Sequence, residues 1–402
     1  MNAVEPMRRP FAGMLALLTT LASASCTTGL GPKTLRTERP DYNRQLLGSH
    51  NAEMLLNLVR LRYNEAPLFL QVGSMVANYK YEAGMSAGGG VGSGNGGSSG
   101  TFGGNLDYRE QPTITYSPLI GEDFAQRMLT PLPIESIMLF EQSGWSAQRL
   151  MLVGVQQINE VYNAPTSNGP TPATEPDFET FLDLAQRLER LRDAGLVGFN
   201  WEFPRTGRRP SDRSARAKTS KATANDAGGD SASPAPGGLP RVWLHEPARP
   251  DDPLAADVAA VRRILDLPAG RDEYVLDGFP FGRQPDHIGI RCRSLLGIMF
   301  FLSLAVEVPQ EHVAAGLVTV TKAKDGRPFD WRLLTDRVLT IHSQKTEPSN
   351  AFVAVKDRGW WFWVAEDDPD SKATFALLGI LYSLQQLTGQ GKVPVLTLPV
   401  GD

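Results

Sequence analysis

The feature that most limits the fold of this chain is a glycine-rich stretch at residues 83–104, AGMSAGGGVGSGNGGSSGTFGG. Eleven of these 22 residues are glycine, and each glycine in a helix costs about 1 kcal/mol relative to alanine. The stretch contains a G-x-S-x-G at residues 84–88 and a G-x-G-x-x-G at residues 92–97. Each motif works only when a helix follows it, to supply an oxyanion-hole amide or to receive a pyrophosphate. Since no helix can follow, we expect neither a catalytic serine nor a dinucleotide site here.

The segments on either side of the glycines alternate apolar and polar residues with a period of two, which is typical of β-strands. We therefore predict an antiparallel hairpin over residues 76–116. In the expected register Tyr79 lies opposite Tyr108, and Lys80 lies opposite Asp107, because both pairs stabilise the sheet. A two-residue slip would keep the faces and lose the second pair. The apolar face, a candidate interaction or membrane surface, carries Tyr79, Tyr81, Met85, Phe102, Leu106 and Tyr108.

Two uses of this hairpin are open. It can pack on helices as an ordinary sheet, or several copies of the chain can each contribute one hairpin to a shared barrel with lipid outside and water inside. About ten tilted residues cross the apolar band of such barrels, roughly 25 Å tall. The barrel plan is similar to that of the curli-type secretion lipoproteins, although no motif of that family is present.

The N-terminus predicts export. Arg8 and Arg9 precede the apolar run FAGMLALLTTLA, which is well short of the roughly 20 residues of a spanning helix, so we expect residues 1–25 to be a removable signal peptide. The following LASASC resembles the lipobox of bacterial lipoprotein precursors, and this resemblance implies that Cys26 is lipidated and becomes the mature N-terminus. The alternative is an ordinary signal peptide with an incidental cysteine. Thr27, where an aspartate would retain such a protein at the inner membrane, implies the outer membrane.

The rest of the chain predicts an α+β fold with mixed, mostly antiparallel sheets and packed helices. We expect a polar extended tether over residues 26–45, an N-terminal α+β region over 46–203, a disordered linker or insertion over 204–240, and a C-terminal α+β region over 241–402. The first helix is expected to start at Ser49 and to close at Pro67. The insertion has no aliphatic residue larger than alanine before Leu239. Its seven Lys and Arg against three Asp fit a solvated loop or a contact with an anionic surface.

Several local patterns give further expectations. Residues 177–195 form the clearest helix, with Asp177 as its cap and Gly195 as its end. Strands are predicted at 150–163, at 316–322 and 337–343, and in a hairpin over 351–365. An apolar helix at 293–308 and a last helix from Ser371 belong to a self-contained final third, and the acidic run 366–370 caps the last helix through Asp370 or Ser371.

Few side chains in the sequence point to chemistry. The five histidines, His50, His245, His287, His312 and His342, show no metal-ligand spacing, so no metal and no cofactor are expected. Cys292 lies in an apolar run and is expected to be a buried, inert thiol. Trp361 and Trp363 would share one face of a strand, either as an aromatic surface for sugar, lipid or a protein partner, or within a strand covered on both sides. A net charge of −4 gives no sign of nucleic-acid binding.

Three segments, LLNLVRLRYNEAPLFLQVGS, RSLLGIMFFLS and DSKATFALL, resemble recurrent parts of a type of bacterial envelope lipoprotein to which no activity is assigned. The sequence thus predicts a non-enzymatic outer-membrane lipoprotein facing the periplasm, with a structural, assembly or transport-associated role. Its expected partners are the membrane, through a palmitate-type lipid, and further copies of the chain or another envelope protein. The alternatives are a periplasmic hydrolase with a site assembled from dispersed residues, and an oligomeric pore to which each copy contributes the 76–116 hairpin.

Overall fold

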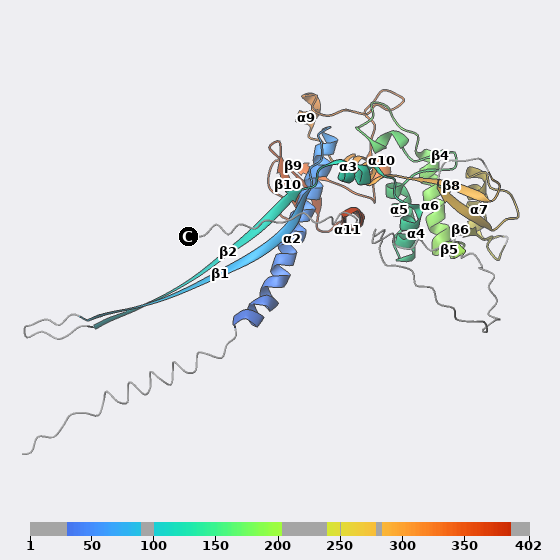
Figure 1. The fold of residues 1–402 in the computed structure, drawn as a ribbon. Helices are drawn as coiled ribbons and strands as arrows, with labels where there is room; N and C mark the ends of the chain where they lie inside the picture. Colours follow the sequence, from blue (N-terminus) through green and yellow to red (C-terminus); the bar gives the residue numbers. More distant parts are fainter. Residues whose placement is uncertain (1–29, 90–99, 203–238, 250, 279–283, 387–402) are drawn as a thin grey trace, which may run out of the picture. The chain divides into compact units, whose positions relative to one another are not determined.

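The computed structural model describes residues 30–89, 100–202, 239–249, 251–278 and 284–386. The signal peptide, Cys26, the G-x-G-x-x-G at 92–97 and nearly all of the 204–240 segment lie outside the described residues. The chain divides into two compact units, residues 1–54 and 55–402. Helices and mixed, mostly antiparallel sheets make up the described residues, which confirms the α+β class (Figure 1).

The first helix, α2 (Leu30–Arg62), is much longer than predicted. Residues 30–45 are helical rather than an extended tether, Ser49 lies inside the helix rather than at its start, and Pro40 is accommodated within it. The helix ends five residues before Pro67, because Asn64 takes a left-handed conformation (φ +58°) that a helix cannot continue. Ten of residues 30–48 are Leu, Arg, Lys, Glu or Gln, which favour helices even without an apolar stripe.

Two long strands form the predicted hairpin: β1 (Leu70–Gly89) and β2 (Gly100–Pro118). Their register differs from the prediction by two residues, with Tyr81 opposite Tyr108 and Lys80 opposite Arg109. The expected Tyr79–Tyr108 and Lys80–Asp107 pairs are therefore wrong. Both registers keep the same alternation of faces, so the alternation could not distinguish them, and the prediction depended on two cross-strand pairs alone. The irregular step between Val72 and Ser74 is a bulge near the base of the hairpin.

A six-stranded sheet forms the second part of the fold, in the order β4-β3-β8-β7-β6-β5. All neighbours are antiparallel except the parallel pair β7–β8. Strands from both sides of the 204–240 segment share this sheet, because β5 pairs directly with β6. That segment is therefore not a boundary in the fold. The strands are β3 (Val155–Ile158), β4 (Val161–Tyr162), β5 (Val197–Glu202), β6 (Leu239–Leu244), β7 (Glu273–Gly278) and β8 (His287–Cys292).

The sheet is accompanied by short helices: α3 (Glu122–Leu129), α4 (Ile134–Gln142), α5 (Ala147–Gly154), the 3-10 helix η1 (Pro165–Asn168), α6 (Glu179–Asp193) and α7 (Pro253–Ile264). The helix predicted at 177–195 is α6. The strand predicted at 150–163 is wrong in its first part, which is the end of α5. Gly195 ends α6 in the left-handed region (φ +71°) as predicted. Asp177 does not cap α6, since no side-chain cap is formed there.

A three-stranded sheet, β10-β11-β9, comes from the last part of the chain. The hairpin of β10 (Ala351–Asp357) and β11 (Trp360–Ala365) is confirmed, with Arg358 (φ +48°) and Gly359 (φ +80°) in the turn. The strand predicted at 316–322 is wrong, because that segment makes only isolated bridges at Lys322. The remaining elements are α8 (Leu295–Ser303), α9 (Gln310–Ala314), α10 (Arg332–Thr335), β9 (His342–Gln344) and α11 (Pro369–Gln386).

Arg293 joins the last third of the chain to the earlier elements, so that third is not self-contained. This side chain is 1% exposed, and burial lowers its pKa to about 9. Its guanidinium donates to the carbonyl oxygens of Leu152 (2.6 Å) and Asn163 (2.7 Å) and to Oδ1 of Asn168 (2.5 Å). It also lies 4.3 Å from the centre of the Phe301 ring. One side chain thus connects the ends of β8, α5 and η1 to α8.

We expect Arg293→Met to destabilise the protein strongly. Methionine fills similar apolar space, but it leaves several buried acceptors without a donor, and each orphaned group costs about 1–3 kcal/mol. The free energy of unfolding should fall by about 3 kcal/mol or more, measured by urea unfolding followed by tryptophan fluorescence. The matched change Arg263→Met, at an exposed arginine of α7, should stay within about 0.5 kcal/mol. Equal effects of the two changes would contradict this role of Arg293.

Candidate functional site

The base of the long hairpin is held by side-chain hydrogen bonds and by contacts between aromatic rings. Asn57, on α2, is fully buried. Its Nδ2 donates to the Leu68 carbonyl at 2.7 Å, and its Oδ1 accepts from the Leu68 N–H at 3.0 Å. Both backbone groups of Leu68, two residues before β1, are thereby fixed by one side chain. Because the two bonds act on the peptide groups before and after Leu68, they fix the direction in which the chain enters the hairpin.

An aromatic cluster fixes the same base from the other side. Phe69 is 2% exposed, stacks on Tyr382 of α11 with ring centres 5.0 Å apart, and meets Phe124 of α3 edge-on at 5.8 Å. The Leu119 N–H, just after β2, donates to the Phe69 carbonyl at 2.9 Å. Both strands of the hairpin therefore start from a packed and hydrogen-bonded base.

Of the six predicted hairpin residues, the register brings only Tyr81 and Tyr108 opposite each other. The remaining members face other partners: Tyr79 lies opposite Glu110, Met85 opposite Gly104, Ala87 opposite Phe102 and Ala83 opposite Leu106. The G-x-S-x-G at 84–88 lies within β1. The strand continues through Ser86, so the strand-to-helix turn of a nucleophile elbow is not formed there.

Trp361 and Trp363, the predicted aromatic surface, lie on the central strand of the three-stranded sheet and are both half-buried. The Trp363 ring lies 4.8 Å from the His342 ring, and the Lys356 ammonium lies 5.9 Å from the centre of Trp361. Between the two tryptophans, Phe362 is fully buried on the opposite face. One face of β11 is thus core, and the tryptophan face retains partial exposure.

A second cluster joins the end of α2 to the same sheet. The Tyr63 hydroxyl and His312 Nδ1 are 2.6 Å apart, and the Arg358 guanidinium lies 4.2 Å from the Tyr63 ring centre. Burial raises the pKa of Tyr63 to about 12, and burial together with the nearby Arg358 lowers the pKa of His312. A neutral phenol and a neutral imidazole at this distance form a stable hydrogen bond, which suits a structural link between segments.

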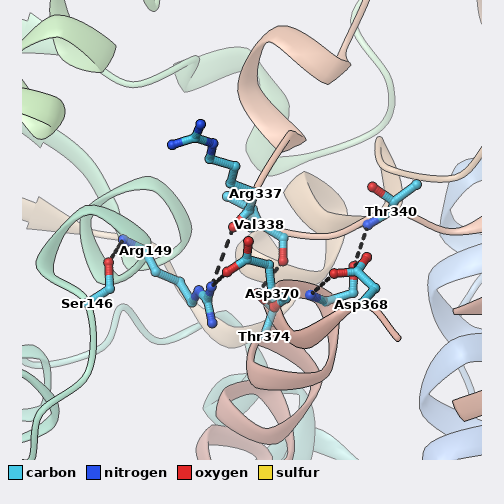
Figure 2. Close-up of polar contacts among 9 residues, drawn as sticks. Ser146, Arg149, Arg337, Val338, Thr340, Asp368, Asp370 and Thr374 are labelled. Carbon is cyan, nitrogen blue, oxygen red and sulfur yellow. Dashed lines mark hydrogen bonds and ion pairs between the residues drawn. The ribbon is translucent and has the colours of Figure 1, made fainter. Parts of the chain in front are cut away.

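Sequence reasoning missed a polar cleft between α5 and the start of α11 (Figure 2). Arg149 of α5, whose side chain is 12% exposed, forms an ion pair with Asp370 in the first turn of α11. Its Nη2 also lies 3.5 Å from the Arg337 carbonyl, and its Nε is buried without a hydrogen-bond partner. Arg337 has a left-handed backbone (φ +61°), and Figure 2 shows its side chain extending away from the Arg149–Asp370 pair.

The start of α11 is tied to the neighbouring loop in the same region. Asp368, rather than the predicted Asp370 or Ser371, caps the helix by accepting from the Ser371 N–H at 3.0 Å. Ser371 Oγ in turn accepts from the Thr340 N–H at 2.9 Å, and the Thr374 hydroxyl donates to the Val338 carbonyl. The predicted capping role of the acidic run is confirmed, with a different residue as the cap.

Two cavities of about 270 and 430 Å³ lie along this cleft and share lining residues around Gln148 and Arg337. Their lining offers guanidinium, carboxylate, amide and aliphatic groups. The Ser146 hydroxyl already accepts from the Arg149 N–H at 3.2 Å as the cap of α5. The cleft is therefore equipped for ion pairing and hydrogen bonding, and no histidine or cysteine belongs to the described lining.

The described residues contain no group of three or more His, Cys, Asp or Glu side chains close enough to share a metal ion. His342 instead bonds Glu307 (3.2 Å), and that bond raises the pKa of His342. Among the described helices, none combines the length and the apolar character needed to cross a bilayer. Cys292 is buried as predicted, and burial raises its pKa to about 12.

Comparison with protein-family models, with curated protein sequences and with solved structures finds no match to this chain.

The Arg149–Asp370 pair predicts a measurable stability effect. Asp370→Asn should lower the free energy of unfolding by about 1 kcal/mol, because it leaves a largely buried guanidinium without its carboxylate. The half-exposed position of Asp370 keeps this value below that of a buried pair. Asp367→Asn is the matched control, since exposed Asp367 accepts only a 3.4 Å bond from Asn350; it should change stability by less than about 0.5 kcal/mol. An Asp370→Asn protein as stable as this control would contradict a stabilising role of the Arg149–Asp370 ion pair.

The raised pKa of Cys292 predicts an unreactive thiol. At pH 8 the thiolate fraction should be very small in the folded protein, so iodoacetamide should alkylate Cys292 at least about 100 times more slowly than in guanidinium-unfolded protein. Mass spectrometry of the Cys292 peptide after timed quenching measures both rates. Similar rates in the two states would show that the site is open to solvent and that the raised pKa is wrong.

Proposed function

We propose that this protein is a non-enzymatic, lipid-anchored component of the outer membrane that acts by assembling with further copies of itself through its long hairpin. The lipid anchor rests on the lipobox-like LASASC and Cys26. The assembly role rests on one structural observation: β1 and β2 form a sheet of only two strands, paired from Leu70 and Pro118 to Gly89 and Gly100. Transport across the envelope or support of an envelope structure are the roles that such an assembly serves.

Each edge of this two-stranded sheet can accept a further strand. Each strand pairs on one side only within the described residues, so the outer edge of each is a row of backbone donors and acceptors that can pair with another strand. An isolated two-stranded hairpin is marginally stable in water, and three or more strands are normally needed. Strands of 20 and 19 residues are also far longer than the usual 5–6 residues. Pairing with the same hairpin of another copy supplies the missing neighbours.

The length of the strands favours a membrane-related form of this assembly. At about 3.3 Å per residue, 20 residues reach about 65 Å, whereas 9–11 tilted residues cross a bilayer. About half of each strand therefore suffices for a shared barrel, and the rest can connect it to the body. The oligomeric pore is accordingly the second candidate function, and it differs from the first only in whether the hairpins enclose water within lipid.

The built base of the hairpin supports the same proposal. Asn57 and Phe69 hold the entry and exit of the ribbon against α2, α3 and α11 through the bonds and ring contacts described above. A fixed base lowers the entropy lost when several hairpins align, which favours assembly.

The test compares the mature lipoprotein, in a mild detergent, with two variants that each lack one internal segment. Replacing residues 74–115 by a short Gly-Ser turn should convert a discrete oligomer into a monomer, measured by light scattering coupled to size exclusion. Deleting residues 205–236, which join β5 to β6, is the control and should leave the oligomer unchanged. Thermal unfolding of each variant checks that the body remains folded.

The outcomes separate the parts of the proposal. An oligomer that depends on the hairpin and conducts ions in planar bilayers supports the pore; one that does not conduct supports a structural assembly. A wild-type protein that is monomeric at every concentration would contradict assembly through the hairpin. Metabolic labelling with palmitate, lost in Cys26→Ser, tests the anchor separately, and an unlabelled wild-type protein would overturn it.

A further inference from the structure

An apolar cavity of about 90 Å³ lies between the six-stranded sheet and the helices α4, α5, α6 and α7. Its walls are aliphatic and aromatic side chains, and the charged residues among them are Glu141 and Arg192. For comparison, an engineered apolar cavity of about 150 Å³ stays dry and binds benzene. The present cavity is similarly apolar but smaller, so a hydrocarbon chain enters it only where lining side chains move apart.

The lining of the cavity is long. It includes residues of β3, β8, β7, β6 and β5, which are five consecutive strands of the sheet. At 4.7–4.9 Å between neighbouring strands, four spacings extend about 19 Å. An apolar path of this length across one face of a sheet suits an extended hydrocarbon chain better than a compact ring. Side chains in the path must shift to admit the whole chain, and the existing cavity reduces the cost of that shift.

The charged part of the lining is a single ion pair. Arg192 Nε and Glu141 Oε1 are 2.7 Å apart, and the two side chains are 23% and 12% exposed. Glu141 lies four residues after Ile137 on α4, and Arg192 lies four residues after Leu188 on α6, so each charge shares a helix face with an apolar lining residue. Ile137 and Leu188 are themselves half-buried. The pair is therefore a charged part of the lining that is also partly exposed.

We propose that this cavity binds the hydrocarbon chain of a fatty acid, with the carboxylate of the ligand on the Arg192 guanidinium. The chain lies between the sheet and the helices, and Glu141 turns toward solvent when the ligand carboxylate takes its place. Guanidinium and carboxylate groups form strong, paired hydrogen bonds, while Glu141 keeps Arg192 satisfied when no ligand is bound. This site is independent of assembly through the hairpin.

The test uses the full-length protein and a palmitate that carries a photoreactive diazirine at the tail end. Irradiation followed by mass spectrometry of peptides should place the label on α4, α5, α6 or the facing strands. Ala147→Phe, at a buried lining residue of α5, should reduce this labelling about tenfold because the ring fills the cavity. Ala314→Phe, at an exposed position of α9, should leave it unchanged, and thermal unfolding confirms that both variants fold.

A second variant tests the headgroup contact without filling the cavity. In the wild type, unlabelled palmitate should compete with the label about tenfold better than hexadecanol, and Arg192→Met should remove that difference. Label confined to surface peptides, or equal labelling of the Ala147→Phe and Ala314→Phe proteins, would overturn the cavity as the binding site. Equal competition by palmitate and hexadecanol in the wild type would overturn the role of Arg192.

Discussion

The buried guanidinium of Arg293 is the interaction on which the larger sheet and its helices depend. A cation removed from water is costly unless all of its donors are satisfied. Here the acceptors are backbone carbonyls at the end of α5 and in the segment before η1, together with the Asn168 amide oxygen. The carbonyl end of a helix carries partial negative charge, which suits a guanidinium. The backbone of Arg293 adds bonds to Gly154 (2.7 Å) and Leu132 (3.0 Å), so the segments that meet there are fixed together.

This arrangement explains where the sequence-based expectations succeeded and failed. The helix at 177–195 and the hairpin at 351–365 have clear periods of their own, and the structure contains both. Residues 150–154 are apolar on all sides, so no period distinguishes helix from strand. In the helix, the carbonyls of Leu152 and Val153 accept hydrogen bonds from Arg293, about 140 residues away. No local sequence pattern indicates a contact between residues so far apart in the chain.

The candidate sites show the same limit. Alternation along residues 76–116 was enough to predict a hairpin and its faces, but a shift by two residues preserves both, so the register could not be read from the pattern. Asn57 and Phe69, which build the base, lie in an ordinary amphipathic helix and an ordinary strand start in the sequence. Glu141 and Arg192 are 51 residues apart, on two different helices, and only the packing of those helices on the sheet brings them into the lining of one apolar cavity. Their separate helical patterns give no sign of the pair.

The short helix α5 connects these features physically. Ala147, Leu150 and Met151 face the apolar cavity, Arg149 holds the start of α11, and the last carbonyls receive Arg293. An eight-residue helix has few hydrogen bonds of its own and is marginal in isolation, so its position is set by these three sets of contacts together. Expansion of the cavity around a ligand must move the same rigid element that contacts Arg149 and Arg293. For this reason α5 is where occupancy of the cavity would first alter the contacts at the start of α11, and α11 also supplies Tyr382 to the base of the hairpin.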